Sequence, residues 1–429
     1  MPNAASTTSA LSQRLMSLDA LRGFDMFWII GADALVRGLR SMKDTPFTGK
    51  LAEQLEHVEW EGFRFYDLIF PLFVFMVGVA LVYSLTRTIQ QEGGAAALKR
   101  VCRRGVLLFA LGIFYSGGLS SAWPDIRLMG VLQRLALTYF FAGLLFCFFK
   151  PRALAAIAVS LLLGYWALMA LVPIRDIQLT KNSLAAVAEK GGDTRAAEFF
   201  QQAGNPSAVK DSPAWVAAER MYFATTNRVT GKFGKGLNLC DHFDFQHLPG
   251  RKYDQFFDPE GYLSTIPAVV TCLLGVFAGL LLRNTSVADQ RKVLLLLGCG
   301  VAGAALGWLW DLQFPVIKKI WTSSYVLVAG GYSALLLGAF FQVVDVWKFQ
   351  KWCQPFVWIG MNSITLYLTS NMLGGFRRLG ARLAGGDVQA WFNAHLVKGS
   401  GDMLVSIVGL LLVFWFANFL YRKKIFLRL

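Results

Sequence analysis

The chain has 429 residues, of which 55% are hydrophobic and only 16% are charged, and its mean hydropathy is +0.46. Soluble domains carry about 25% charged residues, so this composition excludes a protein whose whole surface faces water. Apolar runs of roughly 20 residues recur along the chain, each long enough to cross a hydrocarbon core of about 30 Å. The sequence therefore predicts an all-α, polytopic membrane helix bundle, with membrane lipid as a partner.

The charge balance is basic, with 42 Lys and Arg against 27 Asp and Glu. In a membrane protein such an excess is typical of cytoplasmic loops. No basic soluble module studded with aromatic residues is present, so we expect no nucleic-acid partner. The opening segment MPNAASTTSALSQRLMS contains no apolar core, and we therefore expect no cleavable signal peptide.

Ten apolar segments are predicted to be transmembrane helices. Their approximate bounds are 19–40, 65–86, 103–121, 128–149, 153–173, 262–282, 292–312, 321–345, 355–373 and 402–421. Basic residues are more numerous in the short segments on the side of the termini, which is typical of the cytoplasmic side. We therefore expect both termini to be cytoplasmic and His57 to lie on the outer side.

One polar insertion, residues 174–261, separates the fifth and sixth apolar segments. A connection this long usually has a function or a small fold of its own, and PAWVAAERMYF predicts an amphipathic helix within it. The predicted topology places the insertion outside the membrane on the outer side, where it would cover the mouth of a cavity. We interpret residues 1–429 as one transmembrane domain that carries this insertion.

The first apolar segment, SLDALRGFDMFWIIGADALVRGL, contains ionisable residues on one face. With 3.6 residues per turn, Asp19, Arg22, Asp25 and Asp33 share a face about 120° wide. Charged groups inside a bilayer are costly and are retained where they pair or line a wet cavity. One interpretation is that Asp19 and Asp25 clamp Arg22, whereas Asp33, near the outer end, faces a polar site.

His57 lies in EHVEWEGFRFYDLIFPLFVFMVG, where charged residues directly precede an apolar run. A neutral imidazole accepts a proton near neutral pH, and Asp67 and Asp33 are candidate carboxylates to orient it. The alternative is a solvated loop histidine without a catalytic role. The CDHFDFQH sequence at residues 240–247 contains metal-ligand residue types, but its spacing matches no standard zinc pattern, so we predict no metal site.

Further polar residues occur at or near the ends of later apolar segments, and most of these ends share the outer side in the predicted topology. The residues are Gln133, Arg134, Asp258, Glu260, Lys318, Ser323 and Asn362. This convergence predicts one shared polar cavity. Helix capping or hydrogen bonding between helices is the alternative for each residue.

Six segments resemble the heparan-α-glucosaminide N-acetyltransferase-like transmembrane acyltransferases, and they occur in the family's order. They are RLMSLDALRGFDMFW, EWEGFRFYDLIFPLFVFMVG, GVLQRLALTY, DPEGYLSTIPAVVTCLLGVFAG, KKIWTSSYVL and GMNSI. Within this family the chain looks like the bacterial members, some of which have been labelled N-acetylglucosamine-related transporters. The resemblance implies that an acetyl group passes from cytosolic acetyl-CoA, a co-substrate, to the amino group of a glucosamine-type sugar across a bacterial inner membrane.

The resemblance also implies site residues. In the family the catalytic histidine immediately precedes the W-x-G…D-L-x-F-P segment, and His57, three residues before Trp60, occupies that place. The lysosomal enzyme has an asparagine where this chain has Asp33, which leaves the role of that position open. His57 would act as a general base or as a transient acetyl carrier. Residues expected to bind the sugar are Trp60, Glu59 and the seven polar residues named above, while Arg22, Arg103 and Arg104 are expected to bind the anionic end of acetyl-CoA.

Two other functions stay open from the sequence. An amino-sugar transporter would use the same cavity for binding without reaction. An O-acyltransferase of surface glycans would use the same D-x-L-R-G opening of the first helix. The oligomeric state is also open, with a homodimer as one alternative.

Overall fold

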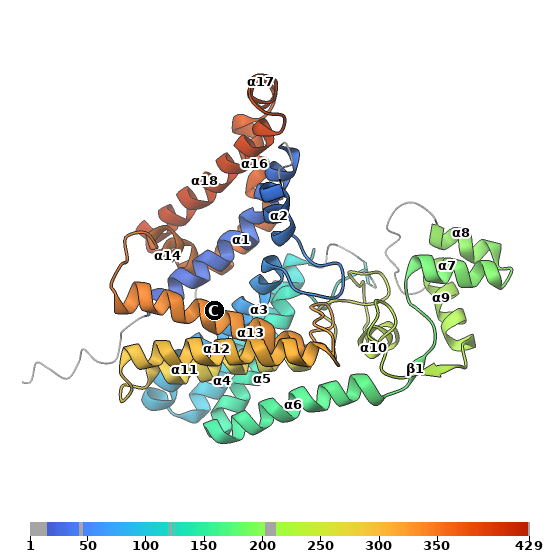
Figure 1. Ribbon diagram of the computed structural model, residues 1–429, viewed down its shortest axis with the longest axis horizontal. Helices are drawn as coiled ribbons and strands as arrows, with labels where there is room; N and C mark the ends of the chain where they lie inside the picture. Colours follow the sequence, from blue (N-terminus) through green and yellow to red (C-terminus); the bar gives the residue numbers. More distant parts are fainter. Residues whose placement is uncertain are drawn as a thin grey trace, which may run out of the picture. The chain divides into compact units, whose positions relative to one another are not determined.

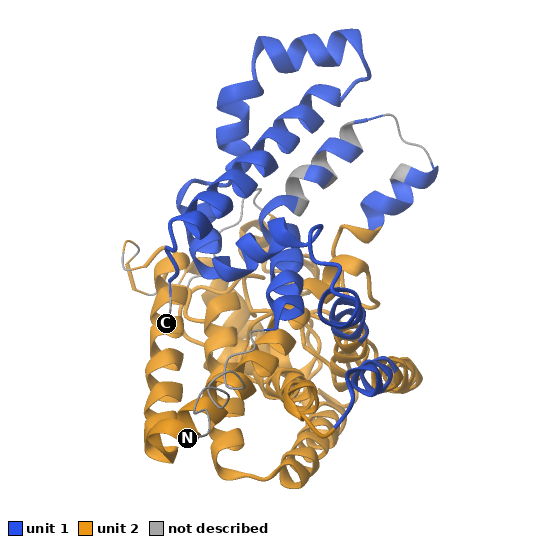
Figure 2. Ribbon diagram, turned by 90° about the vertical axis from the view of Figure 1, so that its left-hand side faces the viewer, with its two compact units in different colours: residues 1–53, 287–297, 335–428 blue, residues 54–286, 298–334, 429 orange. Residues whose placement is uncertain are grey.

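The computed structural model describes residues 15–42, 46–118, 120, 122–123, 125–201 and 212–427, and this part of the chain is predominantly helical (Figure 1). The chain divides into two compact units (Figure 2). The first unit contains residues 1–53, 287–297 and 335–428, and the second contains residues 54–286, 298–334 and 429. The predicted all-α, polytopic membrane fold is confirmed.

The second unit contains the longest apolar helices and the insertion between two of them. Its elements are α3 (Phe65–Glu92), α4 (Gly94–Tyr115), α5 (Val131–Phe148), α6 (Pro151–Leu171), β1 (Ile174–Arg175), α7 (Lys181–Lys190), α8 (Thr194–Gln201), α9 (Pro213–Ala224), β2 (Arg228–Val229), α10 (Leu239–His247) and α11 (Thr265–Arg283). It also contains most of α12 (Asp289–Asp311) and the first part of α13 (Ser323–Phe340).

Helix α3 is the central packing partner within this unit, since it contacts α4, α5 and α11. Two glycines allow the closest approach of α3 to α11. A Cβ atom on Gly78 would lie 2.0 Å from the Cys272 carbonyl oxygen, and one on Gly275 would lie 1.9 Å from the Phe75 carbonyl oxygen. Small residues let membrane helices approach closely where no hydrophobic effect drives them together. The start of α3, which bears Asp67, is therefore held on a tightly packed pair of helices.

The first unit contains α1 and the C-terminal helices. Its elements are α1 (Met16–Ser41), α2 (Pro46–Gln54), η1 (Phe341–Val346), α14 (Gln354–Met361), α15 (Ser363–Met372), α16 (Phe376–Ala384), α17 (Asp387–His395) and α18 (Ser400–Arg422). Helix α1 packs against α14 and α18, and a Cβ atom on Gly23 would lie 1.7 Å from the Phe356 carbonyl oxygen. The LRG sequence of α1 therefore provides the gap that α14 requires.

Each of the ten predicted segments overlaps at least one helix. Within the described residues, seven helices are long and apolar enough to cross a membrane, by length and composition alone: α3, α5, α6, α11, α12, Ser323–Val346 and α18. Helices α1 and α4 carry more charges, and the predicted segment 355–373 divides at Asn362 into α14 and α15. The number of ten spans and their orientation stay predictions.

Helix α4 begins at Gly94, well before the predicted start at residue 103. The additional turns contain alanines together with Lys99 and Arg100. Alanine, lysine and arginine are good helix formers, but the charges of Lys99 and Arg100 make this part of the helix polar, so hydropathy finds only the second half of the helix.

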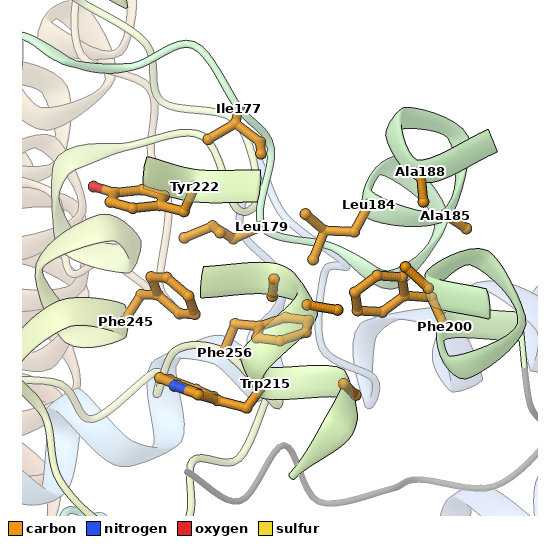
Figure 3. Close-up of a cluster of buried hydrophobic side chains, with 14 of the residues drawn as sticks. Ile177, Leu179, Leu184, Ala185, Ala188, Phe200, Trp215, Tyr222, Phe245 and Phe256 are labelled. Atoms are coloured by element: carbon orange, nitrogen blue, oxygen red, sulfur yellow. The ribbon is translucent and has the colours of Figure 1, made fainter. Parts of the chain in front are cut away.

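The insertion folds around a hydrophobic core of its own (Figure 3). Helices α7, α8, α9 and α10 contribute to it, and Trp215 packs on Phe245 with ring centroids 4.6 Å apart. The predicted amphipathic helix is α9, which begins with Pro213 after Ser212 accepts a hydrogen bond from the Trp215 amide (3.2 Å). Strands β1 and β2 pair antiparallel and close the base of the insertion. The core explains how a polar segment of this length holds a defined structure.

Inside the insertion, His242 of α10 is 1% exposed, and its Nε2 donates to the carbonyl oxygens of Ile177 (3.1 Å) and Gly236 (3.3 Å). Burial lowers the pKa of His242 from 6.5 to about 4, so the folded protein keeps the ring neutral. The unfolded chain binds a proton as the pH falls below 6.5 and the folded chain does not, so stability decreases by about 3 kcal/mol towards pH 4.

We expect His242→Gln to remove this loss, because an amide N–H can still donate to the two carbonyl groups and does not titrate. Thermal unfolding of the detergent-solubilised protein at pH 7 and pH 4.5 measures the difference. His247→Gln, on the exposed side of the same helix, serves as the control and should keep the wild-type dependence. Identical acid sensitivity of His242→Gln and the wild type would contradict the assignment.

Candidate active site

An imidazole–carboxylate pair lies at the start of α3. The Nδ1 atom of His57 lies 2.8 Å from Oδ1 of Asp67, and Oδ2 of Asp67 accepts hydrogen bonds from the amides of Val58 and Arg64, both at 3.2 Å. Asp67 is 1% exposed, whereas the His57 side chain is 52% exposed. The carboxylate therefore fixes the loop that carries the histidine and leaves the ring accessible.

This contact favours one histidine tautomer. A carboxylate only accepts hydrogen bonds, so the contact with Asp67 favours a proton on Nδ1 of His57 and a basic Nε2. The ring of Tyr66 stacks on the imidazole at 4.5 Å between centroids, and the Tyr325 hydroxyl donates to the Asp67 carbonyl oxygen (2.8 Å). A ring held in this way is typical of a histidine that transfers protons.

Lys318 lies against the same pair. Its Nζ atom is 2.9 Å from Nδ1 and 3.3 Å from Nε2 of His57, and 3.4 Å from Oδ1 of Asp67. The two similar distances to the ring nitrogens place the ammonium group between them, beside the ring. Desolvation lowers the pKa of Lys318, although the charge of Asp67 opposes this. The site therefore combines a base with a cation that can donate to an oxygen developing negative charge.

These groups open onto a cavity of about 280 Å³. It is lined by residues from four connections that are distant in sequence: around His57, around Arg127, from Tyr253 to Glu260, and from Lys318 to Trp321. Five residues predicted as site residues line it together: His57, Trp60, Arg134, Glu260 and Lys318. The structure thus brings three of the seven predicted polar residues at helix ends, Arg134, Glu260 and Lys318, to one cavity with His57.

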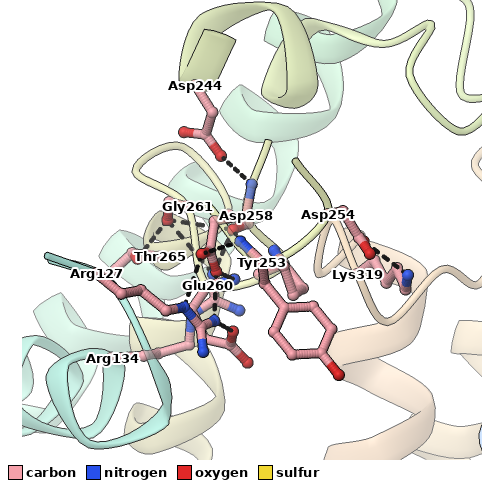
Figure 4. A network of polar contacts seen from close by, with 12 residues as sticks. Arg127, Arg134, Asp244, Tyr253, Asp254, Asp258, Glu260, Gly261, Thr265 and Lys319 are labelled. Atoms are coloured by element: carbon pink, nitrogen blue, oxygen red, sulfur yellow. Dashed lines mark hydrogen bonds and ion pairs between the residues drawn. The ribbon is translucent and has the colours of Figure 1, made fainter. Parts of the chain in front are cut away.

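Arg127, which the sequence did not single out, forms one wall of the cavity (Figure 4). Its Nε and Nη2 bind the two carboxylate oxygens of Asp258 at 2.9 and 2.8 Å, and Nη2 also lies 2.8 Å from Oε2 of Glu260. Burial raises the pKa of Glu260, as does the charge of Asp258, while the two arginines Arg127 and Arg134 counteract this. Asp258 and Glu260 therefore act mainly as ion-pair partners of Arg127, and they hold its side chain in the cavity wall.

Arg134, at the start of α5, is fully buried beside the cavity. Its guanidinium lies 4.9 Å from the centre of the Trp321 ring, and Nη2 donates to the Ser264 hydroxyl. Its Nε and Nη1 atoms are buried without a hydrogen-bond partner among the described residues. Buried donors without partners are costly, so these two atoms are available to a bound molecule.

Trp321 was also missed by sequence analysis. It lies beneath Arg134, and its indole N–H donates to the Thr271 hydroxyl (3.1 Å). Its φ of +50° is unusual for a bulky residue and turns its ring beneath the cavity. Its position in KKIWTSSYVL gave no indication of this role, because the backbone conformation is set by the tertiary fold.

Five residues predicted to bind the sugar do not line this cavity: Glu59, Gln133, Asp258, Ser323 and Asn362. Glu59 is exposed, and Gln133 packs against Gly112, where a Cβ atom would meet its Oε1 at 2.5 Å. Ser323 donates to the Leu162 carbonyl oxygen (2.8 Å), which is the interhelical hydrogen bond that stood as the alternative. Their predicted contact with a sugar finds no support in this geometry.

The arginines predicted to bind acetyl-CoA are also outside the cavity lining. On α4, Arg103 is exposed and Arg104 lies 4.8 Å from the centre of the Tyr139 ring. In the first unit, Arg22 pairs with Asp19 at 3.5 Å. The expected second clamp by Asp25 is wrong, since Asp25 is fully buried and neither of its oxygens has a hydrogen-bond partner in the described part of the chain.

Two remaining predicted residues belong to the first unit. Asn362 lies at the break between α14 and α15, and its amide donates to the Trp358 carbonyl oxygen (3.3 Å). Asp33 is part of α1, but its side chain lies outside the described residues, so its proposed pairing with His57 stays a prediction. Among the described side chains, no group of three or more His, Cys, Asp or Glu residues is arranged to hold a metal ion.

The sequence is similar to that of a known enzyme family. Residues 14–185 match the family model described as heparan-α-glucosaminide N-acetyltransferase, catalytic, and this range includes His57, Asp67 and Arg134. Over these residues the chain is similar to this family. The mouse heparan-α-glucosaminide N-acetyltransferase is 29% identical over 392 residues, and the human one is 27% identical over 434 residues.

These alignments cover 86% and 97% of this chain, but only 56% and 60% of the two relatives. The chain therefore spans less than two thirds of the curated proteins it matches. The activity and the substrates of this chain therefore follow as a proposal.

Proposed function

We propose that the chain is a membrane acetyltransferase that moves an acetyl group from cytosolic acetyl-CoA to the amino group of a glucosamine-type sugar on the outer side of a bacterial inner membrane. The observation that carries this proposal is the His57–Asp67 pair at 2.8 Å, with Lys318 beside it, at the edge of a cavity of about 280 Å³. The match to the catalytic family model over residues 14–185 supports the same reaction.

The proposed chemistry begins with the neutral amine of the sugar, which attacks the thioester carbonyl carbon of acetyl-CoA. The new C–N bond forms, Nε2 of His57 takes the proton from the amine nitrogen, and the C–S bond breaks. The imidazolium then returns the proton to the thiolate of CoA. Asp67 stabilises the imidazolium through Nδ1 throughout this sequence.

The carbonyl oxygen gains negative charge during the attack. Lys318 and the unpartnered Nε and Nη1 atoms of Arg134 line the same cavity and supply donors for such an oxygen. Donors fixed before the reaction stabilise developing charge in a site that excludes water. This arrangement supports acyl transfer rather than binding alone.

The test uses the purified protein in detergent with acetyl-CoA and measures free thiol. We expect CoA release with glucosamine, and only background release with N-acetylglucosamine or without sugar, because the blocked amine has no nucleophilic lone pair. Equal release with the blocked sugar would indicate O-acyl transfer. Accumulation of sugar in sealed vesicles without CoA release would indicate a transporter and contradict the proposal.

A further inference from the structure

A buried carboxylate of the insertion faces the segment that carries the acidic residues of the candidate active site (Figure 4). Asp244 lies on α10 and is 1% exposed. Its Oδ1 accepts a hydrogen bond from the Tyr262 amide at 3.1 Å, and its Oδ2 accepts one from the Asp258 amide at 3.5 Å. One carboxylate therefore binds both ends of the segment 258–262.

This segment contains a β-turn with the sequence DPEG, at residues 258–261, in which the Gly261 amide donates to the Asp258 carbonyl oxygen at 2.9 Å. Aspartate at the first position, proline at the second and glycine at the fourth are favoured in type I turns. Pro259 and Glu260, at the two central positions, line the cavity of about 280 Å³ that His57 also lines. The position of this turn therefore sets the shape of the cavity.

The turn is in close contact with Asp244 at Gly261. A Cβ atom on Gly261 would lie 1.8 Å from Oδ2 of Asp244, so a side chain at this position would displace the carboxylate. The Gly261 carbonyl oxygen also accepts a hydrogen bond from Oγ1 of Thr265 at 2.8 Å, at the start of α11. The turn is therefore held between the insertion and an apolar helix.

Helix α10, which carries Asp244, is itself fixed by two further contacts. Phe245, the next residue, packs on Trp215 in the core of the insertion, with ring centroids 4.6 Å apart. One helical turn before Asp244, Sγ of Cys240 lies 2.9 Å from the Tyr165 hydroxyl of α6. Asp244 thus extends towards the turn from a helix that is packed on both the insertion core and α6.

The chemistry of Asp244 suits the two groups that it binds, because both are backbone N–H donors and a carboxylate only accepts hydrogen bonds. Hydrogen bonds to an ionised acceptor are roughly twice as strong as those between neutral groups. The carboxylate of Asp258, which would repel that of Asp244, is paired with Arg127 at 2.8 Å. Asp244 therefore holds the turn more firmly than a neutral side chain of the same size would.

We infer that Asp244 is a positioning residue of the candidate active site, which holds the turn at residues 258–261 so that Glu260 and Arg127 shape the cavity for the acceptor. The inference rests on the proposed function, and it gives the insertion a role in acceptor binding. Asp244 is not among the residues that line the cavity, so it acts through the turn. The His57–Asp67 pair is built on a different segment, at the start of α3.

Asp244→Ala is expected to raise the KM for glucosamine about tenfold and to keep kcat within about twofold of the wild type, because the base and its carboxylate stay in place. In the purified protein in detergent, hydrogen–deuterium exchange should increase at the amides of residues 258–262 and stay unchanged at residues 57–67. Asp244→Asn keeps one acceptor oxygen, so it is expected to lie between the wild type and Asp244→Ala in both measurements.

Gly261→Ala tests the same contact from the side of the turn, since its methyl group takes the space of the carboxylate. It should raise KM and the exchange at residues 258–262, and adding Asp244→Ala should cause no further increase. Asp241→Ala is the matched control, because it removes another buried carboxylate of α10, one that binds the Gly236 amide at 2.8 Å. This control should keep the wild-type KM.

Unchanged exchange at residues 258–262 in Asp244→Ala would overturn the inference, and so would increased exchange with an unchanged KM. Equal rises in KM for Asp244→Ala and Asp241→Ala would also overturn it, because any disturbance of the insertion would then have the same effect. Increased exchange in Asp244→Ala, together with a wild type that transfers no acetyl group, would contradict the proposed function and leave Asp244 as the residue that holds the turn.

Discussion

Replacing His57 by alanine is expected to lower kcat for acetyl transfer by about 10²–10⁴-fold, the usual contribution of a positioned general acid–base group. The ring is the exposed member of the pair with Asp67, and it lines the cavity. The rate of CoA release at saturating glucosamine measures the effect. His247→Ala, at an exposed position of α10, is the matched control and should retain wild-type activity.

Asp67→Asn tests the orienting role of the carboxylate separately. The amide can still accept from a backbone N–H, but it carries no charge to stabilise an imidazolium at 2.8 Å. We expect a large loss of kcat with little change in KM, since the carboxylate is buried and does not contact the sugar cavity. Wild-type rates in a folded His57→Ala protein would contradict the assignment of the base.

The same variant distinguishes the two mechanisms that remain open. With labelled acetyl-CoA and no acceptor, a transient acetyl carrier would accumulate labelled protein, whereas a general base would not. His57→Ala should remove any such label. Absence of label in an active wild-type protein would favour direct transfer in a ternary complex.

The second large effect is expected from Arg127→Met, which should lower the free energy of unfolding by about 3–5 kcal/mol. Asp258 is fully buried at its side chain and Glu260 is 13% exposed, and both pair with Arg127 at 2.8 Å. Methionine preserves much of the side-chain volume but leaves two buried carboxylates without their cation. The shift in the thermal unfolding midpoint in detergent measures the loss.

Neutralising the partners provides the internal control. Arg127→Met combined with Asp258→Asn and Glu260→Gln should recover much of the stability, because no unpaired charge remains buried. Arg220→Met removes an exposed ion pair with Asp193, in which the two side chains are 65% and 37% exposed, and should cost about 1 kcal/mol or less. If both arginine variants had equal small effects, the buried network would not be a stabilising element.

The helices of this protein were largely predictable, because the bilayer imposes a local requirement. Each spanning segment must satisfy its own backbone hydrogen bonds and present about 20 apolar residues, which any window of the sequence reveals. The same rule fails where a helix contains charged residues, and where an apolar segment is not one continuous helix. Helix α4 continues through Lys99 and Arg100, and the predicted segment 355–373 breaks at Asn362.

Only the part of the candidate site that comes from residues close together in the sequence was predictable. His57 and Asp67 are ten residues apart, so a loop before a helix brings them together with few alternatives. Arg127 and Asp258 are 131 residues apart, and Lys318 is 261 residues from His57. The hydrophobic periodicity within one segment carries no information on contacts between residues so far apart in the sequence.

By itself, the sequence determined the membrane class, the approximate helices and the family resemblance, and it offered His57 with two candidate carboxylates, Asp33 and Asp67. Only the tertiary structure decided that Arg127 and Trp321 form the walls of the cavity, that Ser323 serves helix packing, and that Asp244 of the insertion binds the turn beside the cavity. The reason is physical: apolar length acts within one segment, whereas a cavity depends on which distant helix ends meet when the helices pack.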